Sequence, residues 1–65
     1  MTKFEAIGMM KAGQKVRHRY FSPDEWVTIE NGEYVFEDGV RCDPDFFWMD
    51  RQQEFWNDGW EIFNG

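Results

Sequence analysis

Residues 26–37 read WVTIENGEYVFE, and this stretch decides the fold of the chain. Two runs of alternating apolar and polar residues, at 26–30 and 33–37, flank the pair Asn31 and Gly32. Asn-Gly between such runs is the strongest short signal of a β-hairpin, because a type I′ turn needs positive φ at both central residues. The stretch therefore predicts two antiparallel strands joined by a two-residue turn.

A two-residue turn also fixes which residues face one another across the hairpin. The expected cross-strand pairs are Glu30–Glu33, Ile29–Tyr34, Thr28–Val35 and Val27–Phe36. In this register one face is wholly apolar, with Val27, Ile29, Tyr34 and Phe36. The other face carries Trp26, Thr28, Glu30, Glu33, Val35 and Glu37. A register shifted by one residue would mix apolar and charged side chains on both faces, so the separation favours this pairing.

Further strands are expected before and after the hairpin. Residues 15–20, KVRHRY, alternate strictly and predict a strand. Residues 60–63, WEIF, follow a turn at 57–59 and predict the last strand. Residues 40–42, after an Asp-Gly turn, leave room for a short additional strand.

Capping signals predict two helices. Thr2 and Glu5 fit a capping box that opens a helix over about residues 3–12, and Gly13 supplies its left-handed end. A second short helix, over about residues 44–51, begins after an Asp-Pro pair.

Apolar residues at helical spacing support the first helix. Phe4, Ile7 and Met10 or Lys11 recur at spacings of three and four. Close packing of the helix on the sheet would also explain Gly8. We therefore expect residues 1–65 to form a single α+β domain, a small antiparallel sheet with helical cover on one face.

Aromatic residues are more abundant than a minimal core requires. The 65-residue chain has seven Phe, four Trp and two Tyr, which make up 20% of it. Each buried aromatic side chain removes about 150–250 Å² from water, and so small a body can hardly hide all of them. We expect most to form the core and some to line a binding surface.

No catalytic or metal-binding pattern stands out. A single cysteine excludes an internal disulfide, and one Cys with one His cannot build the usual zinc site. His18 has no nucleophile paired with it by a recognised motif, so we expect it to be structural. We therefore predict a protein without cofactor that is not an enzyme.

Charge is unevenly placed along the chain. Residues 1–20 carry five basic side chains and one acid, whereas residues 21–65 carry two basic side chains and twelve acids. The net charge of −6 argues against direct binding to duplex DNA, which needs clustered cations. There is no apolar run of the roughly 20 residues that span a bilayer and no secretory signal, so we expect a cytoplasmic protein without membrane contact.

A cationic strand face suggests the first binding site. Lys15, Arg17 and Arg19 alternate on one side of the strand at 15–20 and would attract phosphate. With Trp26 or Tyr20 stacking on a base, these side chains suit a nucleotide-derived ligand, and self-association into a homo-oligomer would complete the pocket. The same cations would also suit an edge strand kept soluble by charge, or ion pairs within the chain.

The acidic surplus suggests a second, alternative site. Glu30, Glu33 and Glu37, together with Trp48, could present a negative surface that resembles nucleic acid to a protein partner. The same carboxylates would also serve as an ordinary solubilising surface.

The two ends of the chain resemble a group of small phage proteins. FEA at 4–6 with KAGQKVR at 11–17 looks like their opening, and DGWEI at 58–62 looks like their ending. The group includes the Thoeris anti-defence proteins, which sequester cyclic nucleotide immune signals without cleaving them. The segments at 20–26 and 46–49 are similar to uncharacterised early proteins of large tailed phages.

This resemblance implies a phage-encoded counter-defence protein that acts in the host cytoplasm. It implies sequestration of a nucleotide-derived immune signal, with Arg17, Arg19 and Trp26 in the pocket. The alternative is an acidic inhibitor, of the anti-CRISPR or DNA-mimic type, that occludes a nucleic-acid-binding host defence protein.

Overall fold

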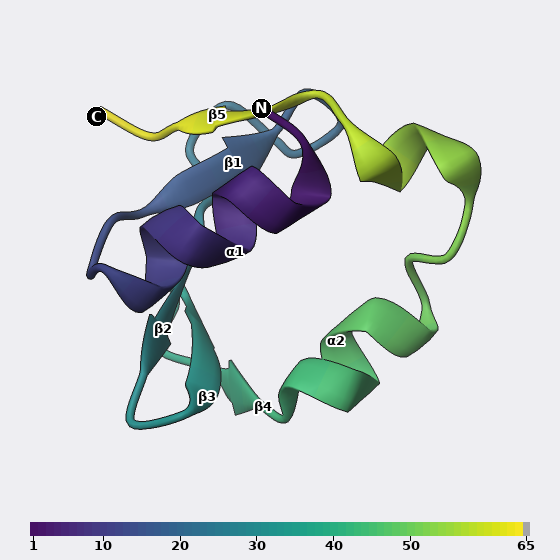
Figure 1. Ribbon diagram of the computed structural model, residues 1–65. Helices are drawn as coiled ribbons and strands as arrows, with labels where there is room; N and C mark the ends of the chain where they lie inside the picture. The colour runs from purple at the N-terminus through teal and green to yellow at the C-terminus, as the bar shows by residue number, and fades with distance from the viewer. Residues whose placement is uncertain (65) are drawn as a thin grey trace.

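The computed structural model describes residues 1–64 and has the α+β architecture that the sequence predicts (Figure 1). Five antiparallel strands form one sheet in the order β4-β3-β2-β1-β5. The elements are α1 (Lys3–Lys11), β1 (Val16–His18), β2 (Val27–Glu30), β3 (Glu33–Phe36), β4 (Arg41–Cys42), α2 (Pro44–Met49), the 3-10 turn η1 (Glu54–Asn57) and β5 (Trp60–Ile62).

The central hairpin has the predicted register. All four expected pairs are present, from Val27 opposite Phe36 at the open end to Glu30 opposite Glu33 at the turn. Asn31 and Gly32 have φ of 52° and 80°, the left-handed conformation that a type I′ turn requires. The prediction from residues 26–37 is confirmed.

The strands around the hairpin are shorter than the sequence predicts. β1 ends at His18, because the chain turns there and the Phe21 N–H donates to the His18 carbonyl at 2.9 Å. The helix α2 is also shorter than expected and ends at Met49. The 3-10 turn η1 comes after it and has no side-chain cap that the sequence could have indicated.

One face of the sheet is buried under the helices. Figure 1 shows α1 lying across β1, β2 and β5, while α2 lies beside β3. The core gathers fully or almost fully buried residues from both layers: Ala6, Met10, Val16, His18, Phe21, Val27, Tyr34, Phe47 and Trp60. The opposite face of the sheet carries no helix among residues 1–64.

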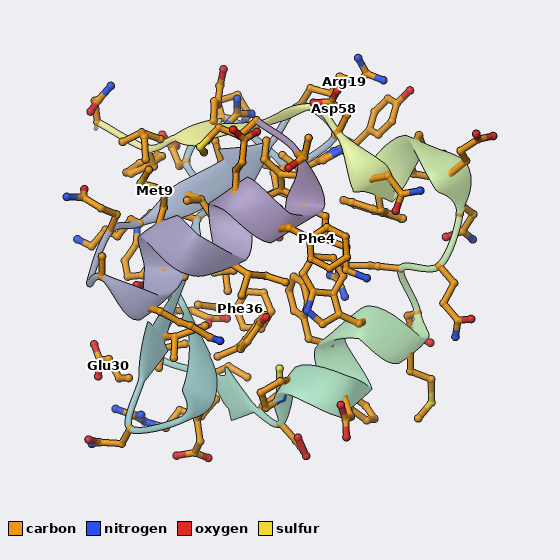
Figure 2. The ribbon with its side chains drawn as sticks, in the orientation of Figure 1. Phe4, Met9, Arg19, Glu30, Phe36 and Asp58 are labelled. Carbon is orange, nitrogen blue, oxygen red and sulfur yellow. The ribbon has the colours of Figure 1, made fainter. Side chains whose placement is uncertain are left out.

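The buried face of α1 does not include all of the apolar residues at helical spacing. Ala6 and Met10 are fully buried, whereas Phe4 is 79% exposed. A small side chain at the contact lets the helix approach the sheet closely, while Phe4 in the first turn stays outside the core. Figure 2 shows Phe4 pointing from this turn toward the region between α1 and α2. Phe4 therefore lies outside the core.

The capping box of α1 is confirmed. The Thr2 hydroxyl accepts from the Glu5 N–H at 3.2 Å, and the Glu5 carboxylate accepts from the Thr2 N–H at 2.8 Å. The hydrogen bond that the Thr2 backbone N–H donates to the Glu5 carboxylate is the main cause that lowers the pKa of Glu5. A carboxyl with a lowered folded pKa contributes stability that is present above its unfolded pKa, about 4.3, and is lost as the pH falls through the folded pKa.

His18 is a buried structural residue, as expected. Its Nε2 lies 2.7 Å from the Asp58 carbonyl and 3.0 Å from the Phe55 carbonyl, so this nitrogen carries the proton. Its Nδ1 accepts from the Tyr20 N–H at 3.1 Å. The hydrogen bonds of the ring therefore connect β1 to Phe55 of η1 and to Asp58, which follows η1.

Replacing His18 tests how much these hydrogen bonds stabilise the fold. His18→Phe keeps an aromatic ring but leaves the Tyr20 N–H without its acceptor and two buried carbonyls without their donor. Each unsatisfied group costs about 1–3 kcal/mol, so we expect the free energy of unfolding to fall by at least about 2 kcal/mol. Urea denaturation followed by tryptophan fluorescence measures it; a loss below about 0.5 kcal/mol would contradict the assignment.

Gly8 is not required by close packing, which corrects the expectation for this residue. A Cβ at Gly8 would meet no atom within 4 Å. We therefore expect Gly8→Ala to raise the free energy of unfolding by about 0.5–1 kcal/mol, because alanine loses less backbone entropy in a helix.

Gly59 provides the matched control for this substitution. It has φ of +84°, and a Cβ there would lie 3.1 Å from His18 Nε2 and 3.2 Å from Arg19 Nε. Gly59→Ala should therefore destabilise the protein in the same urea titration. Equal changes in the free energy of unfolding for Gly8→Ala and Gly59→Ala would contradict the interpretation of both glycines.

Candidate functional site

The guanidinium of Arg17 is engaged within its own chain. Its Nη1 forms a hydrogen-bonded ion pair with the Glu61 carboxylate, and its Nη2 donates to the Phe21 carbonyl at 3.1 Å. The side chain is only 18% exposed. A phosphate could reach Arg17 only by displacing Glu61.

Trp26 lies on the open face of the sheet, the same face as Arg17. Because Val16 pairs with Val27 and both are buried, Arg17 after Val16 and Trp26 before Val27 point away from the core. The Lys15 ammonium lies 4.4 Å from the centroid of the Trp26 ring. Phe63 packs beside the same ring, with 6.4 Å between centroids.

Arg19 and Tyr20 lie beyond the end of β1 and form a different group. The Arg19 guanidinium lies 5.4 Å from the centroid of the Tyr20 ring, and Tyr20 packs edge-on against Phe55 of η1 at 5.0 Å. The Arg19 N–H donates to the Gly59 carbonyl at 3.0 Å, in the chain segment that leads into β5. Within residues 1–64, Arg19 and Tyr20 form no aromatic or ionic contact with Arg17 or Trp26.

The acids proposed as an alternative site are partly neutralised. Arg41 Nη2 lies 3.0 Å from Glu30 and its Nη1 lies 3.7 Å from Glu33, while Glu37 is exposed in the turn after β3. Trp48 lies on the helical side of the sheet, where its Nε1–H donates to the Tyr34 hydroxyl at 2.8 Å. Trp48 and the hairpin acids therefore do not share a surface.

An open hollow of about 460 Å³ lies between α1 and α2. It is lined by Lys3, Asp45, Trp48, Met49 and Gln52. The Lys3 ammonium lies 4.4 Å from the centroid of the Trp48 ring and 5.9 Å from that of Phe4. The hollow is therefore a shallow basin with an aromatic wall rather than an enclosed cavity.

Large apolar side chains are exposed on the helices that hold this hollow, one of them in its lining. Phe4 is 79% exposed, and Phe46 and Met49 are each 60% exposed. Phe46 and Met49 are three residues apart on α2 and so lie on the same side of that helix. We call this surface the α1–α2 face; its members are Lys3, Phe4, Asp45, Phe46, Trp48, Met49 and Gln52.

The surroundings of the α1–α2 face are acidic. Residues 43–58, which include α2 and η1, carry five carboxylates and one basic side chain, Arg51. The Arg51 guanidinium lies 4.1 Å from the centroid of the Phe47 ring and 5.5 Å from that of Trp56, half-buried behind α2. The exposed charge of this segment is therefore mostly negative.

Sequence reasoning missed the α1–α2 face because the helical spacing of Phe4, Ile7 and Met10 does not show which of these side chains stay exposed. One signal could have indicated it: residues 46–49, FFWM, are four consecutive apolar residues in a short helix. A helix turns about 100° per residue, so four such side chains cannot all face one core. Only Phe47 of the four is fully buried.

Two titratable side chains of β3 and β4 are affected by burial. Burial raises the pKa of the Cys42 thiol and that of the Tyr34 hydroxyl. A thiol with a raised pKa is a poor nucleophile at neutral pH. Residues 1–64 contain no group of three or more His, Cys, Asp or Glu side chains placed to hold a metal ion.

Comparisons with known protein families, with curated proteins and with solved structures found no match to this chain. Within residues 1–64, no helix has the length and apolar character needed to cross a membrane.

Proposed function

We propose that this protein acts by binding another protein, without catalysis, and that the α1–α2 face is its docking surface. The observation that carries the proposal is the exposure of Met49, which lines the hollow, and of Phe4 and Phe46, each next in sequence to a lining residue. Grouped apolar side chains with a polar rim are typical of protein-interaction sites, and aromatic residues are frequent among their energetic anchors.

The charge of the chain supports a basic partner. The chain has a net charge of −6, and the segment that forms much of this face is strongly acidic. Such a surface is complementary to a basic one, which accelerates encounter and selects against acidic partners. Proteins that bind nucleic acid present basic surfaces of this kind.

The resemblance to small phage proteins supplies the biological setting for this proposal. The protein would be a counter-defence inhibitor that covers the nucleic-acid-binding surface of a host defence protein. The carboxylates would take the place of phosphates, while the apolar side chains would supply affinity that salt does not screen.

The docking surface is tested with truncations that leave the core intact. After capture from bacterial lysate and identification of the partner, Phe4→Ala with Met49→Ala should weaken its binding at least tenfold. Truncating an interface anchor typically costs about 1–2 kcal/mol or more. Titration calorimetry measures the affinity, and displacement of labelled nucleic acid from the partner measures the inhibition.

The matched control removes exposed apolar side chains elsewhere. Met9 and Val40 are 41% and 55% exposed, and Met9 lies at the far end of α1 from Phe4 (Figure 2). Met9→Ala with Val40→Ala should leave the affinity unchanged. Equal losses from both pairs, or a partner that releases no nucleic acid when bound, would rule out the proposal.

A second candidate function, sequestration of a nucleotide-derived signal, is favoured by the open face of the sheet. Lys15, Trp26 and Phe63 stand together there, with Arg17 on the same face. A base would stack on Trp26 while its phosphates pair with Lys15 and Arg17. A second copy of the chain would cover the ligand.

The ion pair between Arg17 and Glu61 gives this second function a specific test. Glu61→Gln removes the internal competitor, so it should strengthen binding of cyclic dinucleotides or cyclic ADP-ribose several-fold in titration calorimetry. Glu30→Gln, which removes one charge at the other end of the sheet, is the control. No heat with either the parent protein or Glu61→Gln would exclude the nucleotide function.

A further inference from the structure

We infer that the hollow beside Trp48 receives an arginine side chain of the partner, and that Lys3 occupies this position in the free protein as an internal substitute. The inference deepens the proposed docking function and rests on it. It names the anchor that the acidic and apolar surface would recognise.

Trp48 is a rigid platform for a cation. Its indole N–H is held by the Tyr34 hydroxyl at 2.8 Å, and its ring packs edge-on against Phe47 at 4.8 Å and Trp60 at 5.6 Å. The position of the Lys3 ammonium, 4.4 Å from the ring centroid, marks where a positive charge is attracted by the ring face. The site for a cation therefore already exists in the free protein.

The other groups in the hollow are acceptors. Asp45 has no ion-pair partner within 4.0 Å among residues 1–64. The Gln52 amide nitrogen donates to the Met49 carbonyl at 2.9 Å, which leaves the Gln52 amide oxygen available to a donor. A carboxylate and an amide oxygen beside an aromatic plane favour a group that is flat, positive and rich in N–H.

These features favour arginine over lysine. A guanidinium stacks on an aromatic face through its plane and still presents N–H donors at its edge. Its edge could bond to Asp45 and Gln52 while its plane covers Trp48. The compact ammonium of lysine has no such plane and retains water more strongly.

Lys3 is placed so that it can be displaced. It is the first residue of α1, where the positive end of the helix dipole disfavours a cation. It forms no ion pair within 4.0 Å among the described residues. Its long side chain can swing into solvent while the helix stays in place, so an incoming guanidinium competes only with a weakly held group.

The test uses a hexa-arginine peptide and the intact protein, without the partner. Lys3→Gln removes the internal competitor and should tighten peptide binding about three- to tenfold. Lys11→Gln removes the same charge from the other end of the same helix and should have a clearly smaller effect. Asp45→Asn should weaken binding several-fold, and a hexa-lysine peptide should bind more weakly than hexa-arginine to every variant.

The signal of the Trp48 indole N–H in two-dimensional NMR reports whether the peptide reaches the hollow. It is assigned with Trp48→Phe and should shift on titration, whereas the Trp26 signal should not. Equal binding by Lys3→Gln and Lys11→Gln, an unmoved Trp48 signal, or no binding would each overturn the inference. Those results would not refute docking on the α1–α2 face. That proposal is tested separately by Phe4→Ala with Met49→Ala, and both residues are unchanged in these variants.

Discussion

The pairing of β1 with β5 is the constraint on which the rest of the structure depends. It joins residues 16–18 to residues 60–62 and returns the end of the chain to its beginning. The pairing sets His18 against Trp60 in the core, where the imidazole also bonds to the carbonyls of Phe55 and Asp58. A chain without a disulfide relies on such buried contacts to close a small core.

The same pairing decides the chemistry of the open face of the sheet. Side chains alternate along a strand, so the register that buries His18 opposite Trp60 also sets Arg17 opposite Glu61 on the other side. The guanidinium thereby gains a carboxylate partner in its own chain. An arginine that would otherwise be available to phosphate becomes part of the scaffold.

The α1–α2 face is exposed because a small sheet buries only a few side chains of the two helices. α1 approaches the sheet through Ala6, and α2 turns Phe47 inward. The remaining large side chains of both helices, chiefly Phe4, Phe46 and Met49, have no core left to enter and face solvent. Their position beside the acidic segment at 43–58 is the basis of the proposed docking function.

The sequence alone determined the elements whose signals are local. Asn31 and Gly32 specify the hairpin and its register because few residues adopt positive φ easily, and Thr2 with Glu5 specifies the start of α1 because free N–H groups there need acceptors. Only the tertiary structure decided the rest. The partner of Arg17 is 44 positions away in the sequence, and the exposure of Phe4 depends on how α1 is rotated on the sheet. No local pattern encodes either, because both are set by side chains that meet only when the whole core packs.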